Sequence, residues 1–423
     1  MTDSAVRQHD RSRPYDIVIW GATGFTGRLV AEHLVRTRSD GDLRIALAGR
    51  NLDKLQQIRR ELAAIVDPSA ADIPLELADS FDAEALDALA SKATVVCTTV
   101  GPYAKYGAEL VAACVRQGTD YCDLTGEVTF IRRMIDEHHE AAAEKGTRIV
   151  CCCGFDSIPS DLGALMMQRG MQARHGVPAR QVKLAVTSSK GGASGGTVAS
   201  MLELAEQMRK DKSIRRLLGD PYALEPEGGP RGPDDGDYMG VRFDEDINGW
   251  TAPFVMAAVN TRVVRRSNSL MGHAYGTDFS YQEFMSFRAG PKGFAKACAI
   301  TGGLGGFFAA VGFDPTRALL QRFVLPSPGE GPNEEQRENG FFKMRLHARS
   351  EVNGKSVELR GRVQGFKDPG YGGTAIMLGE AARCLAIDPL DSEGGVITPA
   401  SAMGDALLER LRGAGMVFSV DED

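Results

Sequence analysis

The chain has 423 residues, a formal net charge of −7 and 43% hydrophobic residues. It is too long for one compact core, so we expect two domains. The excess of acidic over basic side chains excludes the electrostatic footprint of a nucleic-acid-binding protein. Residues 1–13 are polar and charged, which predicts a disordered tail and no signal peptide.

The stretch 15–27 carries the first structural signal. An apolar run, Ile17 to Trp20, ends in glycines at 21, 24 and 27, and a helical pattern follows. We expect Gly21 to turn the chain, Gly24 to admit a phosphate close to the backbone, and Gly27 to let the helix pack on the strand. A strand, a glycine turn and a helix N-terminus together suit a pyrophosphate. They predict a dinucleotide site; the alternative is a glycine turn in an ordinary α/β unit.

The end of the second predicted strand, 43–47, bears on the choice of dinucleotide. Arg50 and Asn51 follow this strand, and no carboxylate appears before Asp53. In dinucleotide folds an acidic residue at this place accepts from the ribose 2′-hydroxyl, whereas an arginine faces a 2′-phosphate. The guanidinium group makes planar bidentate contacts with phosphate. NADP(H) is therefore predicted over NAD(H), and a surface ion pair or cap is the alternative for Arg50.

Strand–helix alternation continues to about residue 165 and predicts a parallel sheet with right-handed crossovers. The fourth strand, 94–100, is almost continuously apolar, as a buried parallel strand should be. Ligands bind at the carboxyl ends of such strands. We therefore expect the loop after residue 100 beside the nicotinamide, and Asp79, after the third strand, beside the adenine.

The cofactor site is predicted from these strand ends. Its expected residues are Gly21, Thr23, Gly24, Phe25, Thr26, Gly27, Arg50, Asn51, Asp79, Thr99, Val100, Gly101 and Pro102. No metal site is expected, because the eight cysteines show neither a C-x-x-C pair nor Cys/His ligand spacing. The run Cys151 to Cys153 is interpreted as small buried apolar residues of a protein in the reducing cytoplasm.

The second predicted domain spans 166–373, and we expect 374–415 to pack back on the first domain, 14–165. Residues 341–349 and 355–365 alternate apolar and polar residues around Asn353-Gly354, which predicts a hairpin in an antiparallel or mixed sheet. Segment 218–246, rich in Gly, Pro and Asp, predicts a mobile loop or lid. The glycine-rich segment 190–197 predicts either an anion-binding helix entry or a flexible loop. The three arginines at 262, 265 and 266 could hold a substrate anion or lie on the surface.

Residues 297–313 carry no charged side chain and are rich in glycine. The segment is slightly short for a bilayer span, so a transmembrane helix is disfavoured. An apolar surface for a lipid chain, a membrane or a partner enzyme is one interpretation. A buried helix or a homodimer interface is the other, so the protein is expected in the cytoplasm with membrane association left open.

Several of these motifs resemble one family. Segments 21–27, 48–50, 100–107, 123–127 and 153–161 are similar to the saccharopine dehydrogenase-like oxidoreductases. Segments 190–197 and 398–405 resemble their actinobacterial branch of trans-acting enoyl reductases. The resemblance covers about 15–415 and implies a Rossmann-type domain, a second α+β domain, and NADP(H) as cofactor.

The resemblance also implies a reaction. It indicates NADPH-dependent reduction of an α,β-unsaturated acyl or polyketide thioester, in trans to a polyketide synthase, in complex lipid biosynthesis. Such a reaction needs a donor for the enolate oxygen and a proton for the α-carbon. Tyr103, Tyr106, Asp156 and Ser157 are the candidates, since they follow strand ends; tyrosines packed over the nicotinamide and a capped turn are the structural alternatives.

Two other functions stay open from the sequence. A saccharopine-type amino-acid dehydrogenase or reductase would need basic groups for several carboxylates, which the three arginines could supply. A non-catalytic NADP(H)-binding sensor would need no reaction centre. A short-chain dehydrogenase is disfavoured because none of the nine tyrosines has a lysine four residues later. A zinc dehydrogenase is disfavoured by the missing ligand spacing.

Overall fold

The structure is a computed structural model that describes residues 12–38, 43–191, 202, 206–312, 316 and 331–422. The described residues form two compact units, which divide at Ile158 and Pro159 rather than after residue 165. The first unit holds the described parts of 1–158 and 370–414, and the second those of 159–328, 332–369 and 415–423. The predicted tail lies outside the described residues except for its end, where Arg13 donates to the carbonyl of Gln117 at 2.7 Å. Most of the glycine-rich segment 190–197 also lies outside them.

The first unit alternates strands and helices, as the sequence predicts. Its elements are β1 (Tyr15–Trp20), α1 (Phe25–Thr37), β2 (Ile45–Gly49), α2 (Leu52–Ile65), η1 (Pro68–Asp72), β3 (Leu75–Leu77), α3 (Ala83–Ser91), β4 (Ala93–Thr98), α4 (Tyr103–Tyr106), α5 (Ala108–Gln117), β5 (Asp120–Cys122), α6 (Val128–Glu144), β6 (Arg148–Val150), α14 (Thr374–Ile387), β13 (Gly395–Ile397) and α15 (Pro399–Gly413). The predicted strand 148–153 is shorter in the structure, because Cys151 to Cys153 lie beyond its end.

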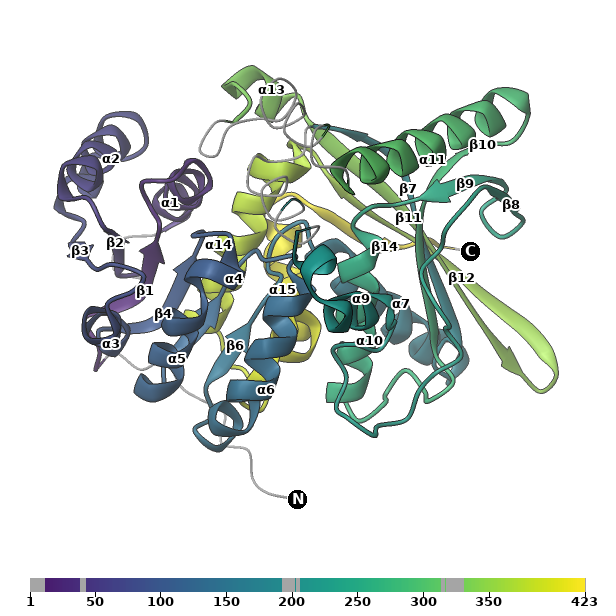
Figure 1. The fold of residues 1–423 in the computed structure, drawn as a ribbon, viewed down its shortest axis with the longest axis horizontal. Helices are drawn as coiled ribbons and strands as arrows, with labels where there is room; N and C mark the ends of the chain where they lie inside the picture. Colours follow the sequence, from purple (N-terminus) through teal and green to yellow (C-terminus); the bar gives the residue numbers. More distant parts are fainter. Residues whose placement is uncertain are drawn as a thin grey trace. The chain divides into compact units, whose positions relative to one another are not determined.

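The sheet of the first unit is parallel, in the order β13-β6-β5-β4-β1-β2-β3. Ile17, Val18 and Ile19 in β1 are fully buried, since a central parallel strand is covered on both faces. Helices α3, α5 and α6 pack in sequence, and α14 packs on α1 and on strands β1, β4 and β5 (Figure 1). The returning segment therefore completes this unit, with β13 pairing parallel to β6.

The second unit carries a mixed sheet. Its elements are α7 (Ile158–His175), β7 (Gln181–Lys190), α9 (Lys212–Gly219), β8 (Arg242–Asp244), β9 (Gly249–Pro253), α10 (Ala257–Leu270), β10 (Ser280–Arg288), α11 (Pro291–Gly312), α13 (Glu334–Glu338), β11 (Phe341–Val352), β12 (Lys355–Gly365), the π-helix η2 (Pro369–Gly373) at the border of the units, and β14 (Val417–Val420). The strand order is β14-β12-β11-β7-β10-β9-β8, and β7 and β10 form the parallel pair. This confirms the predicted fold class.

The hairpin of β11 and β12 has the predicted turn. Asn353 and Gly354 both have positive φ, 52° and 75°, as a two-residue type I′ turn requires. One face of the hairpin packs under α7: a Cβ on Gly163 would lie 3.1 Å from Leu346, and one on Gly361 would lie 2.6 Å from the sulfur of Met167. Side chains at alternate positions leave the other face to solvent.

Segment 218–246 is held in part by side chains of α10, while its predicted mobility or lid role stays a prediction. The three arginines of α10, which the sequence analysis considered as possible ligands of a substrate anion, instead form ion pairs and hydrogen bonds with this segment. Arg265 is 2% exposed; it pairs with Asp234 at 2.9 Å and donates to the carbonyl of Pro221 at 2.9 Å. Arg262 pairs with Asp237, and Arg266 donates to a carbonyl of the same segment. The arginine cluster is a structural anchor, so it does not supply the carboxylate-binding groups of a saccharopine-type site.

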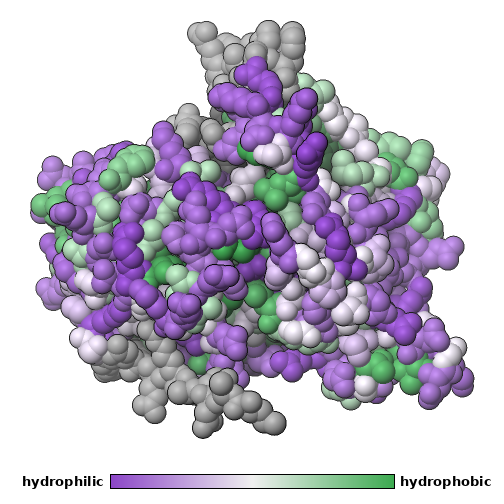
Figure 2. Space-filling model, turned by 60° about the horizontal axis from the view of Figure 1, so that its bottom comes forward, coloured by the Kyte–Doolittle hydropathy of each residue, from purple (hydrophilic) through white to green (hydrophobic). Residues whose placement is uncertain are grey.

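The apolar segment 297–313 lies in α11, apart from residue 313 outside the described set. By length and composition α11 could cross a membrane, and only 11% of its apolar window is buried. Phe294, Ile300 and Phe308 are 44%, 38% and 46% exposed. The interpretation as a buried helix is therefore wrong, whereas lipid contact and a dimer interface stay predictions. Elsewhere, Figure 2 shows a face covered mostly by hydrophilic side chains, with only small separate hydrophobic areas.

Candidate cofactor site

Two of the three glycines after β1 are required by the fold itself. Gly21 has φ +89°, and its amide donates to the carbonyl of Ala48 at 3.0 Å. A Cβ on Gly21 would lie 2.6 Å from a methyl of Val100, and a Cβ on Gly27 would lie 2.2 Å from the carbonyl oxygen of Gly21. The first turn of α1 is thus pressed against the glycine turn, and neither position has room for a side chain.

Gly24 is not explained by packing. Its φ of −80° suits any residue, it is exposed, and a Cβ there would approach only the carbonyl oxygen of Gly21, at 3.3 Å. Gly24 is the N-cap of α1 without a side-chain cap, and the first turn holds no acidic residue. The amides of Phe25, Thr26 and Gly27 have no acceptor within the helix. No side chain of the described residues caps this positively polarised end, and such an end fits a pyrophosphate.

The end of β4 forms the other wall of this turn. The amide of Thr99 donates to the carbonyl of Trp20 at 3.0 Å, and its hydroxyl donates to the carbonyl of Gly21 at 3.4 Å. Val100 packs on Gly21, while Gly101 is exposed and Pro102 is half-buried. Because β1 lies between β4 and β2, the strand order reverses here, and ligands of open parallel sheets bind at such reversals.

Arg50 follows β2 and is exposed, and the structure gives it no ion pair with any described residue. Thr23 lies beside Gly49, where a Cβ would be 3.8 Å from its hydroxyl. A free guanidinium group therefore stands at the predicted place of the 2′-phosphate. Asn51 already has a structural task, since its side chain caps α2 by accepting from the amide of Lys54 at 2.9 Å.

The side chains of two other predicted cofactor residues, Asp79 and Phe25, also make contacts within the protein. Asp79 is exposed, and its carboxylate accepts from the amide of Phe81 at 3.0 Å, which closes a turn. The ring of Phe25 packs edge-on against Tyr371, with centroids 4.8 Å apart. The side chain of Phe25 therefore has a packing role in the first unit.

Tyr103 does not suit the catalytic role predicted for it. It is 3% exposed, and its hydroxyl donates to the carbonyl of Thr98 at 3.2 Å. Burial raises the pKa of Tyr103 well above its usual range, with Asp123 adding to the effect. The hydroxyl is thus part of the core, and packing of the Tyr103 ring over the nicotinamide stays a prediction.

Glu127 lies between β5 and α6 and has a structural role that the sequence did not indicate. It is buried, and its two carboxylate oxygens accept from the amides of Tyr103 at 2.9 Å and Ala104 at 2.8 Å. It thereby fixes the start of α4 directly after the nicotinamide loop. The sequence indicated Glu127 only through its place after β5 in the motif 123–127. It did not show that the carboxylate would accept hydrogen bonds from the amides of Tyr103 and Ala104.

Tyr106 and Asp156 are half-buried, whereas Ser157 is fully buried. Tyr106 is half-buried between Phe81, with ring centroids 5.6 Å apart, and Lys105, and no described group bonds its hydroxyl. Ser157 is fully buried, so the structure does not bring its hydroxyl to an open surface. Tyr106 and Asp156 are therefore the two sequence candidates that geometry retains.

Asp156 lies on the loop after β6, at the same edge of the sheet as the glycine turn. Its neighbours hold it: the amide of Phe155 donates to the hydroxyl of Thr374 at 3.1 Å, and that of Ser157 to the carbonyl of Cys152 at 2.8 Å. The residue as a whole is half-buried, but its Oδ1 is enclosed and has no hydrogen-bond partner among the described residues. Burial raises the pKa of Asp156 to about 7. Its carboxyl group can therefore carry a proton near neutral pH.

Asp123 is a further residue that sequence reasoning did not single out. It is fully buried at the end of β5 and accepts from the hydroxyl of Tyr121 at 2.8 Å and from the amides of Thr125 and Cys152 at 3.0 and 3.1 Å. Burial raises the pKa of Asp123 to about 6, against these hydrogen bonds. Asp123 ties the loop after β5 to the one after β6, which carries Asp156.

One group in the second unit has the spacing of metal ligands within the described part of the chain. Asp246, His347 and Glu358 place one ligand atom each within 4.8 Å of one another. Asp246 already pairs with Lys183 and Arg349. Because these two cations occupy the carboxylate that a metal would need, the group is better explained as an ion-pair network.

Comparisons with known proteins place an NADP-binding domain in the first unit. A family model described as the saccharopine dehydrogenase NADP binding domain matches residues 17–150. Over 417 residues the chain is 43% identical to a Mycobacterium tuberculosis H37Rv protein whose provisional name is trans-acting enoyl reductase, covering 96% of this chain and 97% of that one. It is 41% identical over 419 residues to the trans-acting enoyl reductase of Mycobacterium bovis BCG, with the same coverage.

A solved structure shares the fold. Saccharopine dehydrogenase (L-Glu forming) from Saccharomyces cerevisiae aligns with 96% of this chain and 99% of its own, at a TM-score of 0.53 and 12% identity. At that identity the likeness concerns the fold alone.

Proposed function

The chain belongs to the saccharopine dehydrogenase-like oxidoreductases, in the branch of the mycobacterial trans-acting enoyl reductases, and from this membership we propose that it is an NADPH-dependent enoyl reductase. Its proposed substrate is an α,β-unsaturated acyl or polyketide thioester. The observation that supports the cofactor half is the uncovered start of α1 at Gly24 together with the unpaired Arg50.

The residues present fit NADPH. The amides of Phe25, Thr26 and Gly27 would hold the pyrophosphate, and Arg50 the 2′-phosphate. The loop 99–102 would border the nicotinamide. When bound, NADPH supplies the hydride that the β-carbon of the thioester accepts.

The protein must then deliver a proton to the α-carbon of the resulting enolate. Asp156 is suited to this step because its raised pKa leaves a protonated carboxyl group at neutral pH, fixed between two anchored residues. Tyr106 is suited to donate a hydrogen bond to the thioester oxygen, since its hydroxyl has no bond to a described residue. A proton donor matched to the working pH contributes roughly 10²–10⁴-fold in rate.

The proposed biological setting is complex lipid biosynthesis, with a polyketide synthase as the partner that supplies the thioester. The names of the relatives support action in trans, since each is called trans-acting. The exposed apolar α11 is compatible with a lipid-rich surrounding.

The test is direct. Purified protein is mixed with NADPH and an enoyl thioester, and the absorbance of the reduced nicotinamide is followed at 340 nm, with NADH and a saturated thioester as controls. NADPH consumption with the unsaturated thioester alone supports the proposal. Turnover of an amino-acid conjugate but no thioester would favour the saccharopine-type alternative, and NADPH binding without any turnover would favour the sensor.

A further inference from the structure

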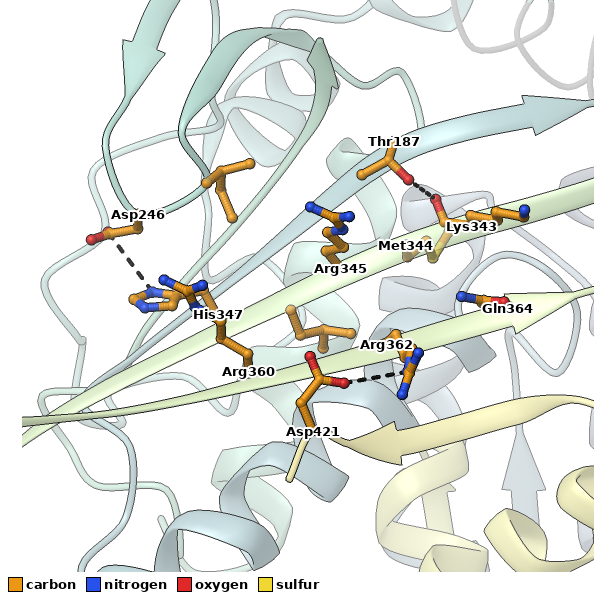
Figure 3. A pocket seen from close by; sticks show the side chains of 13 residues that line it. Thr187, Asp246, Lys343, Met344, Arg345, His347, Arg360, Arg362, Gln364 and Asp421 are labelled. Atoms are coloured by element: carbon orange, nitrogen blue, oxygen red, sulfur yellow. Dashed lines mark hydrogen bonds and ion pairs between the residues drawn. The ribbon is translucent and has the colours of Figure 1, made fainter. Parts of the chain in front are cut away.

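The second unit contains a hollow of about 510 Å³ on the face of its sheet that α7 leaves free. Four cationic side chains from two neighbouring strands line it: Lys343 and Arg345 from β11, and Arg360 and Arg362 from β12 (Figure 3). The lining also holds two carboxylates, Asp246 and Asp421, together with polar and apolar side chains that include Thr187 and Ile247. A concave site of this size exceeds what one inorganic ion fills and suits a small organic ligand.

The register of the hairpin brings these cations together. Arg345 lies directly opposite Arg362, and His347 opposite Arg360. Directly opposed side chains of an antiparallel pair have Cβ atoms about 4.5–5.5 Å apart, and like charges at such positions are destabilising. The arrangement therefore calls for an anion to compensate it.

The carboxylates of the described residues neutralise only part of the positive charge of these four side chains. Arg362 pairs with Asp421 at 3.3 Å, but Lys343, Arg345 and Arg360 form no ion pair with a described residue. Asp246, which also lines the hollow, already pairs with Lys183 and Arg349 and so leaves the charge of these three cations uncompensated. A local positive field thus remains in a chain whose net charge is −7.

The alternative to an anion site is that the four cations lie on β11 and β12 only as solvated surface charges. Their concave setting argues against it, as does the polar and apolar lining beside them: the hydroxyl of Thr187 is held by the carbonyl of Lys343 at 3.0 Å, and Ile247 is half-buried. Guanidinium groups in pairs bind phosphate oxygens bidentately, and this geometry distinguishes phosphate from a simple counterion.

We propose that this hollow binds the phosphate of a phosphopantetheine arm, with Arg345, Arg360 and Arg362 on the phosphate. The choice of ligand rests on the proposed function, because biological acyl thioesters are carried on that arm. It joins a phosphate to a partly apolar chain, as the lining does. The same chemistry reaches the protein from two sources, a carrier protein bearing the arm or free coenzyme A.

The test uses the full-length protein saturated with NADP⁺, so that the nucleotide site does not compete for phosphate. Calorimetry compares phosphopantetheine with pantetheine, which lacks only the phosphate. We expect at least tenfold tighter binding of the phosphorylated arm, weakening as salt is raised. In R345Q/R362Q this difference should disappear. In Lys355→Gln, which also removes an exposed charge from β12 but lies outside the hollow, it should persist.

The two sources are then separated by competition. A carrier protein with its arm attached, the same carrier without the arm, and coenzyme A each compete with labelled phosphopantetheine. Competition by the armed carrier or by coenzyme A supports the proposal and names the source. Equal competition by the unarmed carrier would overturn it, as would equal affinity for pantetheine or an unchanged preference in R345Q/R362Q.

Folding is checked by thermal unfolding, where relief of the opposed charges should leave the midpoint of R345Q/R362Q unchanged or higher. Since binding is read without turnover, a positive result with no thioester reduction would refute the enoyl reductase and keep the phosphate site.

Discussion

Protonation of Asp156 should control the rate of thioester reduction. Its carboxyl group is the proton donor proposed for the α-carbon, and burial raises its pKa to about 7. Changing the pH alters the protonated fraction without changing the sequence. Asp156→Asn removes the acid while keeping the size of the side chain.

The expected size of the effect follows from the pKa. With a pKa of about 7, the protonated fraction falls from roughly nine-tenths at pH 6 to roughly one-tenth at pH 8. The rate limited by proton donation should therefore fall about tenfold over this interval. Asp156→Asn should lower kcat roughly 10²–10⁴-fold and remove the pH dependence.

Stability provides an independent readout of the same group. A folded-state pKa above the unfolded one means that the folded protein binds more protons between about pH 4 and 7. The contribution of Asp156 to the free energy of unfolding is thus fully present below pH 4 and is lost as pH rises to about 7. Urea unfolding of Asp156→Asn should lack this part of the pH dependence.

The assay is NADPH oxidation at saturating thioester from pH 5.5 to 9, with NADPH affinity measured separately by fluorescence. Tyr106→Phe is the matched control: it should weaken enolate stabilisation at every pH and leave the pH profile in place. If Asp156→Asn retains both the wild-type rate and its decline near pH 7, another group donates the proton and the reasoning is refuted.

Three further changes test other parts of the structure. Arg50→Ala should weaken NADPH binding about 10- to 100-fold and leave NADH binding nearly unchanged, because charge-assisted hydrogen bonds contribute about 1.5–3 kcal/mol, as titration with both cofactors will show. Gly27→Ala should destabilise the first unit by several kcal/mol in urea unfolding, since its Cβ would lie 2.2 Å from a carbonyl oxygen. Gly24→Ala is the control, because its Cβ would meet only one atom, the carbonyl oxygen of Gly21 at 3.3 Å, and it should destabilise far less. Arg265→Leu should lower the free energy of unfolding by about 3–5 kcal/mol through the buried Asp234 left unpaired.

Each of these changes has an outcome that contradicts its basis. Equal loss of NADPH and NADH affinity in Arg50→Ala would remove the argument for the 2′-phosphate. A Gly27→Ala protein as stable as Gly24→Ala would mean that the turn adapts. An unchanged urea midpoint in Arg265→Leu would show that segment 218–246 does not depend on this anchor.

The cofactor half of the molecule was predictable because its signals are local. A glycine spacing and an apolar strand lie within a few positions of one another, so the packing roles of Gly21 and Gly27 could be assigned individually, while the role of Arg50 stays a prediction. The Asn353-Gly354 turn was predictable for the same reason.

The errors came from contacts between residues distant in sequence. Arg262 and Arg265 look like surface charges until Asp234 and Asp237 are known to fold back over them. Tyr103 follows a strand end, as a catalytic residue would, but its ring turns into the core. The periodicity of the sequence predicts neither these ion pairs nor the burial of Tyr103, because both depend on where residues of another segment lie.

The order of the chain through the two units has a consequence for protein synthesis. The sheet of the first unit gains β13 from residues 395–397, and that of the second gains β14 from residues 417–420. Neither sheet is therefore complete until the ribosome has made these late segments. The nascent chain must carry both unfinished sheets, each with an open edge, until β13 and β14 have been synthesised. Deletion of residues 417–420 should thus impair expression far more than the short length of the removed segment would suggest.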